Sequence, residues 1–270
     1  MAATQMSTPS CFARQKEISR LPRSTDTSAA YWDQLAPQYE SLYQSAWSRF
    51  EDSELRIQLQ RIVASANGPR LLDIGCGTGL AYELLGVKNS AIEYVGVDIS
   101  VGMLGEFRRK HPEVDVVETA GDSLLPSLKH RQFDIVIATN VAASFPSNTD
   151  NMLRQISSVL CVGGIVSLSF LNRYSLRRRL RGERDLIEQY RTRGHREQTY
   201  VNARCYSASE LVSALNQQEF ENVKCRFSSV LGGVWESRAS VEVERVASRI
   251  VPFLGHAVTV SGRKATEGVI

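Results

Sequence analysis

The hydrophobic positions of this chain gather into short runs from residue 70 onward, and amphipathic segments separate the runs. The runs are rich in Val and Ile, as expected for strands that are covered on both faces. Strands are predicted at 70–75, 93–99, 114–118, 133–139 and 164–171. Helices are predicted between them at 80–86, 101–110 and 150–160. This alternation indicates an α/β fold with a doubly wound parallel sheet.

The last third of the chain has a different pattern. A helix is predicted over 206–220, where Ser207 caps the first turn and Glu210 stands at the reciprocal capping position. Two further strands and a helix between them are predicted at 223–231, 257–263 and 239–251. Because the last two strands can pair with each other, we predict a Rossmann-like seven-stranded sheet, mostly parallel with an antiparallel C-terminal edge strand.

The N-terminal part of the chain is predicted to be helical and separate from the sheet. Residues 28–69 contain two amphipathic helical patterns, and Pro37 interrupts the first. Residues 1–27 are rich in Ser and Thr and are predicted to be a disordered tail, with an organelle transit peptide as the weaker alternative. Residues 70–270 then form one domain.

Composition limits the class of protein. Apolar residues make up 43% of the 270 positions, yet no run approaches the roughly 20 apolar residues of a membrane span. The N-terminus lacks the apolar core of a secretory signal. The five cysteines are scattered without metal-ligand spacing, so we expect no metal site and reduced thiols in a cytoplasmic protein.

Positive charge is concentrated in one segment. Residues 173–196 hold nine arginines against three carboxylates, although the whole chain carries only +3. We expect an Arg-rich helical insertion at about 172–200, a helix pair broken near Gly182 and Gly194. It has three interpretations: a solvated helical face with internal ion pairs, a pocket for an anionic acceptor, or a nucleic-acid surface. The small net charge and the scarcity of aromatic residues among the arginines make nucleic acid an unlikely partner.

Three glycines, Gly75, Gly77 and Gly79, directly follow the first predicted strand. In doubly wound sheets, ligands bind beyond the carboxyl ends of the strands, and glycines let a ligand approach the backbone. The dinucleotide pattern G-x-G-x-x-G fails because Leu80 occupies its sixth position, and the G-K-[ST] of a phosphate-binding loop is absent. A tight turn without any ligand is the structural alternative.

Residues 73–79 read D-I-G-C-G-T-G and resemble motif I of the class I S-adenosylmethionine-dependent methyltransferases, of the small-molecule type. The segments VGVDIS (95–100), AGDSL (120–124) and FDIVIATNVAASF (133–145) extend this resemblance at the family's spacing. The resemblance implies S-adenosylmethionine as the cofactor. It implies the cofactor-binding residues Tyr31, Asp73, Gly75, Cys76, Gly77, Gly79, Asp98, Ile99, Met103, Asp122, Ser123, Asn140 and Val141.

The resemblance also implies roles for the polar members of this set. In the family, the acid at the end of the second strand holds the ribose hydroxyls, which is a role for Asp98. The acid after the third strand receives the adenine amino group, which points to Asp122. Asp73 helps to orient the glycine loop and the amino group of the cofactor, and Asn140 and Val141 lie near its methionine part.

The acceptor side is less defined. The loop after the fourth predicted strand lacks the N-P-P-[YF] of amino-directed nucleic-acid enzymes, and no HxxH or carboxylate cluster suggests a metal-dependent enzyme. Tyr39 lies in an A-x-x-Y pattern that resembles the lid helix of small-molecule members, which makes residues 28–69 a lid. Tyr39, bordering the methyl group, and His195, as a general base, are the candidate catalytic residues.

We therefore predict methyl transfer from S-adenosylmethionine to an oxygen, nitrogen or carbon atom of a small metabolite, with an anionic metabolite as one option. One alternative is an RNA or tRNA methyltransferase that uses the Arg-rich insertion. The other is a non-catalytic partner protein with a methyltransferase fold. We expect no metal and no membrane partner, and the sequence leaves monomer and homodimer equally open.

Overall fold

The computed structural model of the protein describes residues 25–64, 68–128, 130–140, 142–146, 148–191, 199–232 and 234–265. The predicted tail of residues 1–27 lies outside these ranges except for its last three residues. Those three already belong to the first helix, α1 (Thr25–Leu35).

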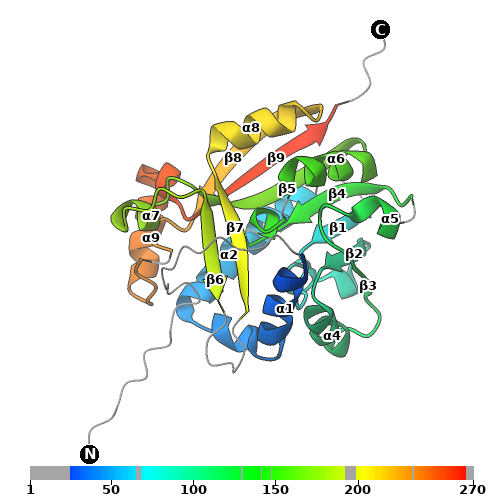
Figure 1. Ribbon diagram of the computed structural model, residues 1–270, viewed down its shortest axis with the longest axis horizontal. Coiled ribbons are helices and arrows are strands. Elements are labelled where there is room, and N and C mark those ends of the chain that lie inside the picture. Colours follow the sequence, from blue (N-terminus) through cyan, green and yellow to red (C-terminus); the bar gives the residue numbers. More distant parts are fainter. Residues whose placement is uncertain are drawn as a thin grey trace, which may run out of the picture.

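One central sheet with helices on both faces forms the body of the protein (Figure 1). In the described ranges its strands are β1 (Arg70–Ile74), β2 (Glu93–Asp98), β3 (Asp115–Glu118), β4 (Phe133–Ala138), β5 (Leu160–Asn172), β6 (Ile187–Arg191), β7 (Tyr200–Tyr206), β8 (Phe220–Ser228) and β9 (Ala257–Lys264). Strands β3, β2, β1, β4 and β5 lie side by side in parallel. The strand order therefore reverses between β1 and β4, which places the topological switch point at the glycine loop.

The predicted fold class is confirmed, including the antiparallel C-terminal pair. β9 runs antiparallel to both β5 and β8, so it lies between them and β8 forms that edge of the sheet. All seven predicted strands are present, each within a few residues of its predicted bounds. β6 and β7 were not predicted; they form an antiparallel pair that joins the sheet where β7 contacts the end of β5.

Outside residues 172–200, the helices match the predicted segments to within a few residues. After α1 they are η1 (Ala36–Gln38), η2 (Glu40–Tyr43), α2 (Ala46–Val63), α3 (Leu80–Leu85), η3 (Val87–Asn89), α4 (Val101–Lys110), α5 (Leu124–Leu128), η4 (Ala142–Ser144), α6 (Thr149–Val159), α7 (Leu176–Leu180), α8 (Ala208–Asn216), α9 (Ser240–Ile250) and η5 (Pro252–Leu254). Pro37 lies in the first turn of η1, where α1 has ended, because proline cannot continue an α-helix. The predicted capping box of Ser207 and Glu210 is present at the start of α8.

Two apolar layers lie on opposite faces of the sheet. One contains Leu124 of α5, Ile156 of α6 and Leu211 of α8. The other contains Leu59 of α2 and Phe107 of α4. Helices α2, α3 and α4 thus cover one face of the sheet, and α5, α6 and α8 cover the other.

The helix pair predicted for residues 172–200 is wrong in the described part of that segment. Only the single turn α7 is α-helical, and it ends next to Gly182, whose φ is +63°. The chain then enters β6, which pairs with β7. Arginine favours helices in isolation, but here the alternating burial of β7 and the pairing of β6 with it outweigh that preference.

Candidate active site

The loop between β1 and α3 holds the three glycines of the predicted motif, and all three have positive φ angles. A Cβ atom added to Gly79 would lie 2.4 Å from the buried ring of Phe107, and one added to Gly75 would lie 2.8 Å from Ala142. A Cβ atom on Gly77 would meet nothing within 4 Å. Packing therefore demands glycine at Gly75 and Gly79, whereas Gly77 presents bare backbone to open space, where a ligand can lie.

Asp98 ends β2 beside this loop, as the resemblance implies. Its Oδ2 accepts a hydrogen bond from the N–H of Gly77 and its Oδ1 one from the N–H of Ser100, each at 2.9 Å. Burial raises the pKa of Asp98, while these backbone hydrogen bonds act in the opposite direction. A carboxylate can accept about four hydrogen bonds. Asp98 uses two of them to hold the loop, so it can still accept hydrogen bonds from the two hydroxyls of a diol.

Asp73 lies in β1 and is almost fully buried, with 1% of its surface exposed. The hydroxyl of Tyr94 donates a hydrogen bond to its Oδ2 at 2.7 Å, but its Oδ1 has no hydrogen-bond partner among the described residues. Burial raises the pKa of Asp73 to about 7. A buried carboxylate oxygen without a donor is costly, and a cationic ammonium group close to it would remove that cost.

The residues predicted to bind the adenine of the cofactor, Asp122 and Ser123, lie in the turn between β3 and α5. The backbone carbonyl of Asp122 accepts hydrogen bonds from the side-chain amides of Asn151, at 2.7 Å, and Gln155, at 2.5 Å. Ser123 follows and is exposed, and its N–H donates to Ala120. Two amides from α6 therefore fix the turn, but the role of the Asp122 carboxylate stays a prediction.

The apolar members of the predicted set are built into the core. Cys76 is buried, and a Cβ atom on Gly96 of β2 would lie 2.8 Å from its Sγ. Burial raises the pKa of Cys76 well above its ordinary value, so the thiol stays protonated and acts as a small packing group. Met103 is buried in one cluster with Tyr31, and Ile99 is partly buried. These side chains shape the site instead of offering hydrogen bonds.

The chain turns sharply after β4 at Asn140. This residue has a φ of +47°, a conformation that asparagine tolerates better than most residues, and its side chain is exposed. The N–H of Ala142 donates to the carbonyl of Thr139 at 2.9 Å, which closes the turn. Val141, which was predicted to lie near the methionine part of the cofactor, is outside the described residues.

Both tyrosines predicted from the lid line a large cavity. Tyr31 is 4% exposed and Tyr39 is partly exposed. Trp32 packs edge-on against Tyr31, Tyr39 and Phe145, with ring centroids 4.9–6.4 Å apart. The predicted lid therefore contacts the loop after β4 through an aromatic cluster. The predicted base His195 is outside the described residues.

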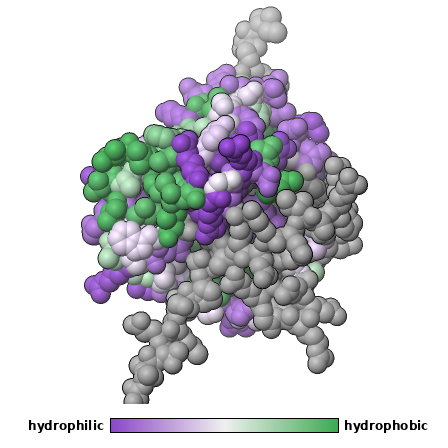
Figure 2. All heavy atoms as spheres, turned by 60° about the vertical axis from the view of Figure 1, so that its left-hand side comes forward, coloured by the Kyte–Doolittle hydropathy of each residue, from purple (hydrophilic) through white to green (hydrophobic). Residues whose placement is uncertain are grey.

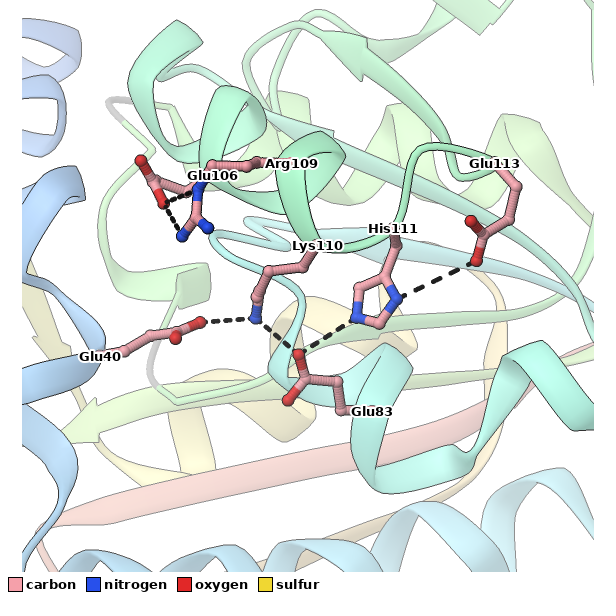
Figure 3. Close-up of polar contacts among 7 residues, drawn as sticks. All are labelled: Glu40, Glu83, Glu106, Arg109, Lys110, His111 and Glu113. Atoms are coloured by element: carbon pink, nitrogen blue, oxygen red, sulfur yellow. Dashed lines mark hydrogen bonds and ion pairs between the residues drawn. The ribbon is translucent and has the colours of Figure 1, made fainter.

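A cluster of charged side chains connects the predicted lid to helices α3 and α4 (Figure 3). Lys110, at the end of α4, contacts Glu40 of the lid and Glu83 of α3, each at 2.5 Å. His111 contacts the same Glu83 oxygen at 3.2 Å. Burial raises the pKa of Glu40, but Lys110, together with a hydrogen bond from Thr78 of the glycine loop, outweighs this and leaves it lowered. Lys110 thus bridges two carboxylates beside the cavity.

The cavity has a volume of about 1050 Å³ and lies between α2 and α9 on one side and the sheet on the other. Thr78 of the glycine loop and Asn140 line it, whereas Asp98 and Asp122 do not. It is therefore a space next to the predicted cofactor site. The sheet contributes a polar floor of Ser167, Ser169 and Thr259.

These floor residues were not predicted, although the sequence contains their signal. Serine alternates with apolar residues in V-S-L-S-F (166–170), and T and S do the same in V-T-V-S (258–261). Such alternation indicates a strand with one polar and one apolar face. The apolar members, such as Leu168 and Val258, pack in the opposite layer, and Ser167, Ser169 and Thr259 face the cavity.

Glu51 of α2 also lines the cavity, and sequence reasoning missed it. The hydroxyl of Ser229 donates a hydrogen bond to its Oε1 at 2.5 Å. Burial raises the pKa of Glu51 to about 7, and the charge of Glu236 adds to the effect. A carboxyl group with this pKa can exchange protons at neutral pH. Burial and positive charge, first that of Arg177, lower the pKa of His256 on the same wall to about 4, so its ring is neutral.

The described arginines nearest the core in the insertion are held by carboxylates. Arg177 and Arg178 are 1% and 2% exposed, and both contact Glu188. Arg178 also contacts Glu183, and Arg173 contacts Glu210 at 2.6 Å. At least three arginines of this segment therefore form ion pairs, as its first interpretation expected, but Arg177 and Arg178 are buried and do not form the solvated helical face of that interpretation.

The site is a binding cavity whose lining includes ionisable side chains such as Glu51 and His256. Within the described ranges, no group of three or more His, Cys, Asp or Glu side chains is placed to hold a metal ion. Across those same ranges, no helix has the length and apolar character needed to cross a membrane.

Comparison with known proteins agrees with this geometry. Residues 72–166 match the family model described as a methyltransferase domain. The chain is 33% identical to an uncharacterized protein of Methanocaldococcus jannaschii over 54% of this chain and 53% of that protein. It is 29% identical to a demethylmenaquinone methyltransferase of Renibacterium salmoninarum over 43% of this chain and 47% of that protein. The chain thus spans about half the length of both relatives.

The fold is shared with solved structures. The CcbJ methyltransferase from Streptomyces caelestis superposes with a TM-score of 0.60 at 17% identity. The match covers 87% of this chain and 98% of that one. At this identity the likeness concerns the fold alone.

Proposed function

Because the chain belongs to the class I S-adenosylmethionine-dependent methyltransferase family, we propose that it transfers a methyl group from S-adenosylmethionine to a small molecule. The observation that carries this proposal is the meeting of two sites. An open backbone at Gly77, with Asp98 beside it, adjoins a cavity of about 1050 Å³ through Thr78. A cofactor in the first site and an acceptor in the second would meet at the carboxyl ends of β1 and β4.

The residues present fit the cofactor. Asp98 would bind the ribose hydroxyls, and the turn of Asp122 and Ser123 would border the adenine. The unpaired Oδ1 of Asp73 suits the ammonium group of the methionine part, directly or through water. The open side of Gly77 leaves room for the chain between these two ends. Each polar end of the cofactor thus has a matching group in this chain.

When bound, S-adenosylmethionine supplies an electrophilic methyl group on a positively charged sulfur. The part of this chain is to hold the acceptor in line and to exclude water, which can be worth about 7–11 kcal/mol in well-oriented systems. Trp32 and Phe145, in edge contact at 5.1 Å, join the lid to the loop after β4. Tyr39 and Thr78 both line the cavity, and Tyr39 would border the methyl group.

An acceptor that arrives as an alcohol or an ammonium must also lose a proton. Glu51 is the best placed group described, because it lines the cavity and its pKa of about 7 suits proton uptake at neutral pH. His195 stays a predicted base, since it lies outside the described residues. We infer that Glu51 would take up the proton that the acceptor group releases.

A small molecule is the acceptor class that the cavity supports best. Its polar floor and aromatic lid suit a ring with hydroxyl or amino groups. One relative is named for methylation of demethylmenaquinone, which is a small-molecule substrate. An anionic acceptor held by the insertion has less support, because Arg173, Arg177 and Arg178 are already paired with carboxylates.

Calorimetric titration with S-adenosylmethionine and S-adenosylhomocysteine tests the proposal. We expect micromolar binding by the wild type and a loss of at least about tenfold in Asp98→Ala, because charged hydrogen bonds contribute about 1.5–3 kcal/mol each. The matched control is Glu93→Ala, an exposed carboxylate at the opposite end of the same strand. No binding by a folded wild type, or equal binding by both variants, would overturn the cofactor site.

A further inference from the structure

Helix α9 is amphipathic, but its apolar side faces away from the molecule. Val243, Val246 and Ile250 recur at helical spacing on one side, and they are 45%, 54% and 70% exposed. Phe253 of η5 follows them and is 50% exposed. We call these four residues the apolar ridge. The apolar stripe of a helix in a soluble protein normally packs on the core, so the orientation of α9 needs a reason.

The other side of α9 is polar and faces inward. Glu244 and Ser248 line the cavity, and so do Arg245 and Arg249, whose side chains also stay exposed at the surface. Glu244 is 1% exposed, and its two oxygens accept hydrogen bonds from the N–H groups of residues 230 and 231 at 2.9 and 2.8 Å. Breaking these buried bonds would be costly. The helix is therefore held with its polar side toward the cavity and its ridge outward.

The ridge is part of a larger apolar surface. Figure 2 shows a broad hydrophobic area on the side of the molecule that carries α7 and α9 in Figure 1. Leu180 of α7 is 66% exposed, and Val234 and Trp235, shortly before α9, are 42% and 48% exposed. Contiguous apolar surface of this kind marks a place where a soluble protein contacts another phase or another molecule.

Charged and aromatic side chains indicate what covers the ridge. In the described residues of α7, α9 and the turns beside them, exposed arginines outnumber exposed carboxylates six to three: Arg179, Arg181, Arg184, Arg238, Arg245 and Arg249 against Asp185, Glu236 and Glu242. Arg245 and Glu242 pair with each other at 3.1 Å, which leaves five arginines against two carboxylates. Trp235 and Phe253 supply aromatic rings of the kind that prefers the boundary between water and lipid. An apolar helix face with arginines and aromatic rings around it is typical of helices that lie in the surface of a lipid layer.

We propose that the apolar ridge of α9 docks this protein on an anionic lipid surface. Anionic headgroups would pair with the arginines while the ridge enters the acyl boundary. A second copy of the chain fits less well, because a two-fold interface would place the arginines of one copy against those of the other. This contact is peripheral and differs from the sequence prediction, which expected no membrane partner.

Sedimentation of the full chain with lipid vesicles tests the proposal without any cofactor. We expect binding to vesicles of phosphatidylcholine mixed with phosphatidylglycerol, weaker binding to phosphatidylcholine alone, and a decrease as salt rises from about 0.05 M to about 0.5 M. Val246→Gln/Ile250→Gln should weaken vesicle binding at least about tenfold, since each removes apolar surface from the acyl boundary. Both residues are exposed, so the fold should persist.

The control is Ile57→Gln/Val162→Gln, which changes two exposed apolar residues, 42% and 55% exposed, that lie on α2 and β5. Vesicle binding should be unchanged in this variant. Retention of binding by the ridge variant would overturn the proposal. So would a wild type that ignores vesicles but sediments as a dimer that the ridge variant dissociates, because the ridge would then be a contact between copies. The titration with S-adenosylmethionine is unaffected by either result, so the two proposals fail separately.

Discussion

Gly77 and Gly79 lie two residues apart, yet the structure gives them different roles that alanine substitutions can separate. In Gly79→Ala the new methyl group would lie 2.4 Å from Phe107, whose side chain has no exposed surface. An extra methyl group in a packed core costs about 1–3 kcal/mol, and a left-handed backbone adds about 1–2 kcal/mol for an L residue. We expect Gly79→Ala to lower the free energy of unfolding by about 3 kcal/mol.

Gly77→Ala should behave differently. Its φ of +54° lies in the small left-handed region, and the new methyl group would meet no atom within 4 Å. Only the backbone cost of about 1 kcal/mol applies to stability. The methyl group would, however, enter the space proposed for the cofactor. We expect the affinity for S-adenosylmethionine to fall at least about tenfold, which corresponds to about 1.4 kcal/mol.

Denaturant unfolding without cofactor and calorimetric titration with it would measure the two effects. Gly86→Ala is the matched control, because Gly86 has a φ of +63° and equally open surroundings but caps the far end of α3. It should share the stability loss of Gly77→Ala and keep the affinity of the wild type. Equal stability losses in Gly77→Ala and Gly79→Ala would refute the packing argument. A Gly77→Ala variant that binds as tightly as Gly86→Ala would refute the ligand argument.

Two further predictions concern buried charge. The pKa of Glu51 is about 7 in the fold and 4.5 ordinarily, so the folded state holds its proton more tightly and the wild type loses stability as pH rises through this window. Glu51→Gln should remove a loss of about 2–3 kcal/mol in the free energy of unfolding between about pH 5 and about pH 8; the same pH dependence of unfolding free energy in both proteins would contradict this. Arg177→Met leaves Glu188 buried beside one fewer cation and should cost about 3 kcal/mol. The double variant Arg177→Met/Glu188→Leu should recover most of that loss in free energy of unfolding, measured by denaturant unfolding. If the double variant lost as much stability as Arg177→Met alone, the two residues would not be coupled.

The sequence by itself predicted the central sheet and placed the glycine loop and Asp98 at the proposed cofactor site. Strands such as 70–75 are short, apolar and bounded by turn residues, so their pattern is local and survives in any tertiary context. The capping box of Ser207 and Glu210 is equally local, because all its atoms lie within one helical turn. Asp98 could be placed beside the glycine loop because adjacent parallel strands end at the same edge of a sheet.

Only the tertiary structure decided the rest. The strand β6 follows an arginine-rich turn whose local preference is helical, and its pairing with β7 depends on residues a dozen positions away. The raised pKa of Glu51 and the unpaired oxygen of Asp73 arise from burial by distant segments. The amphipathic pattern of α9 predicts a helix but not which side faces inward. That choice rests on Glu244, whose hydrogen bonds to the chain after β8 turn the polar side toward the cavity. The local sequence pattern determines whether a segment forms a helix or a strand. The side that a helix turns inward and the pKa of a buried side chain depend on the segments that pack against them.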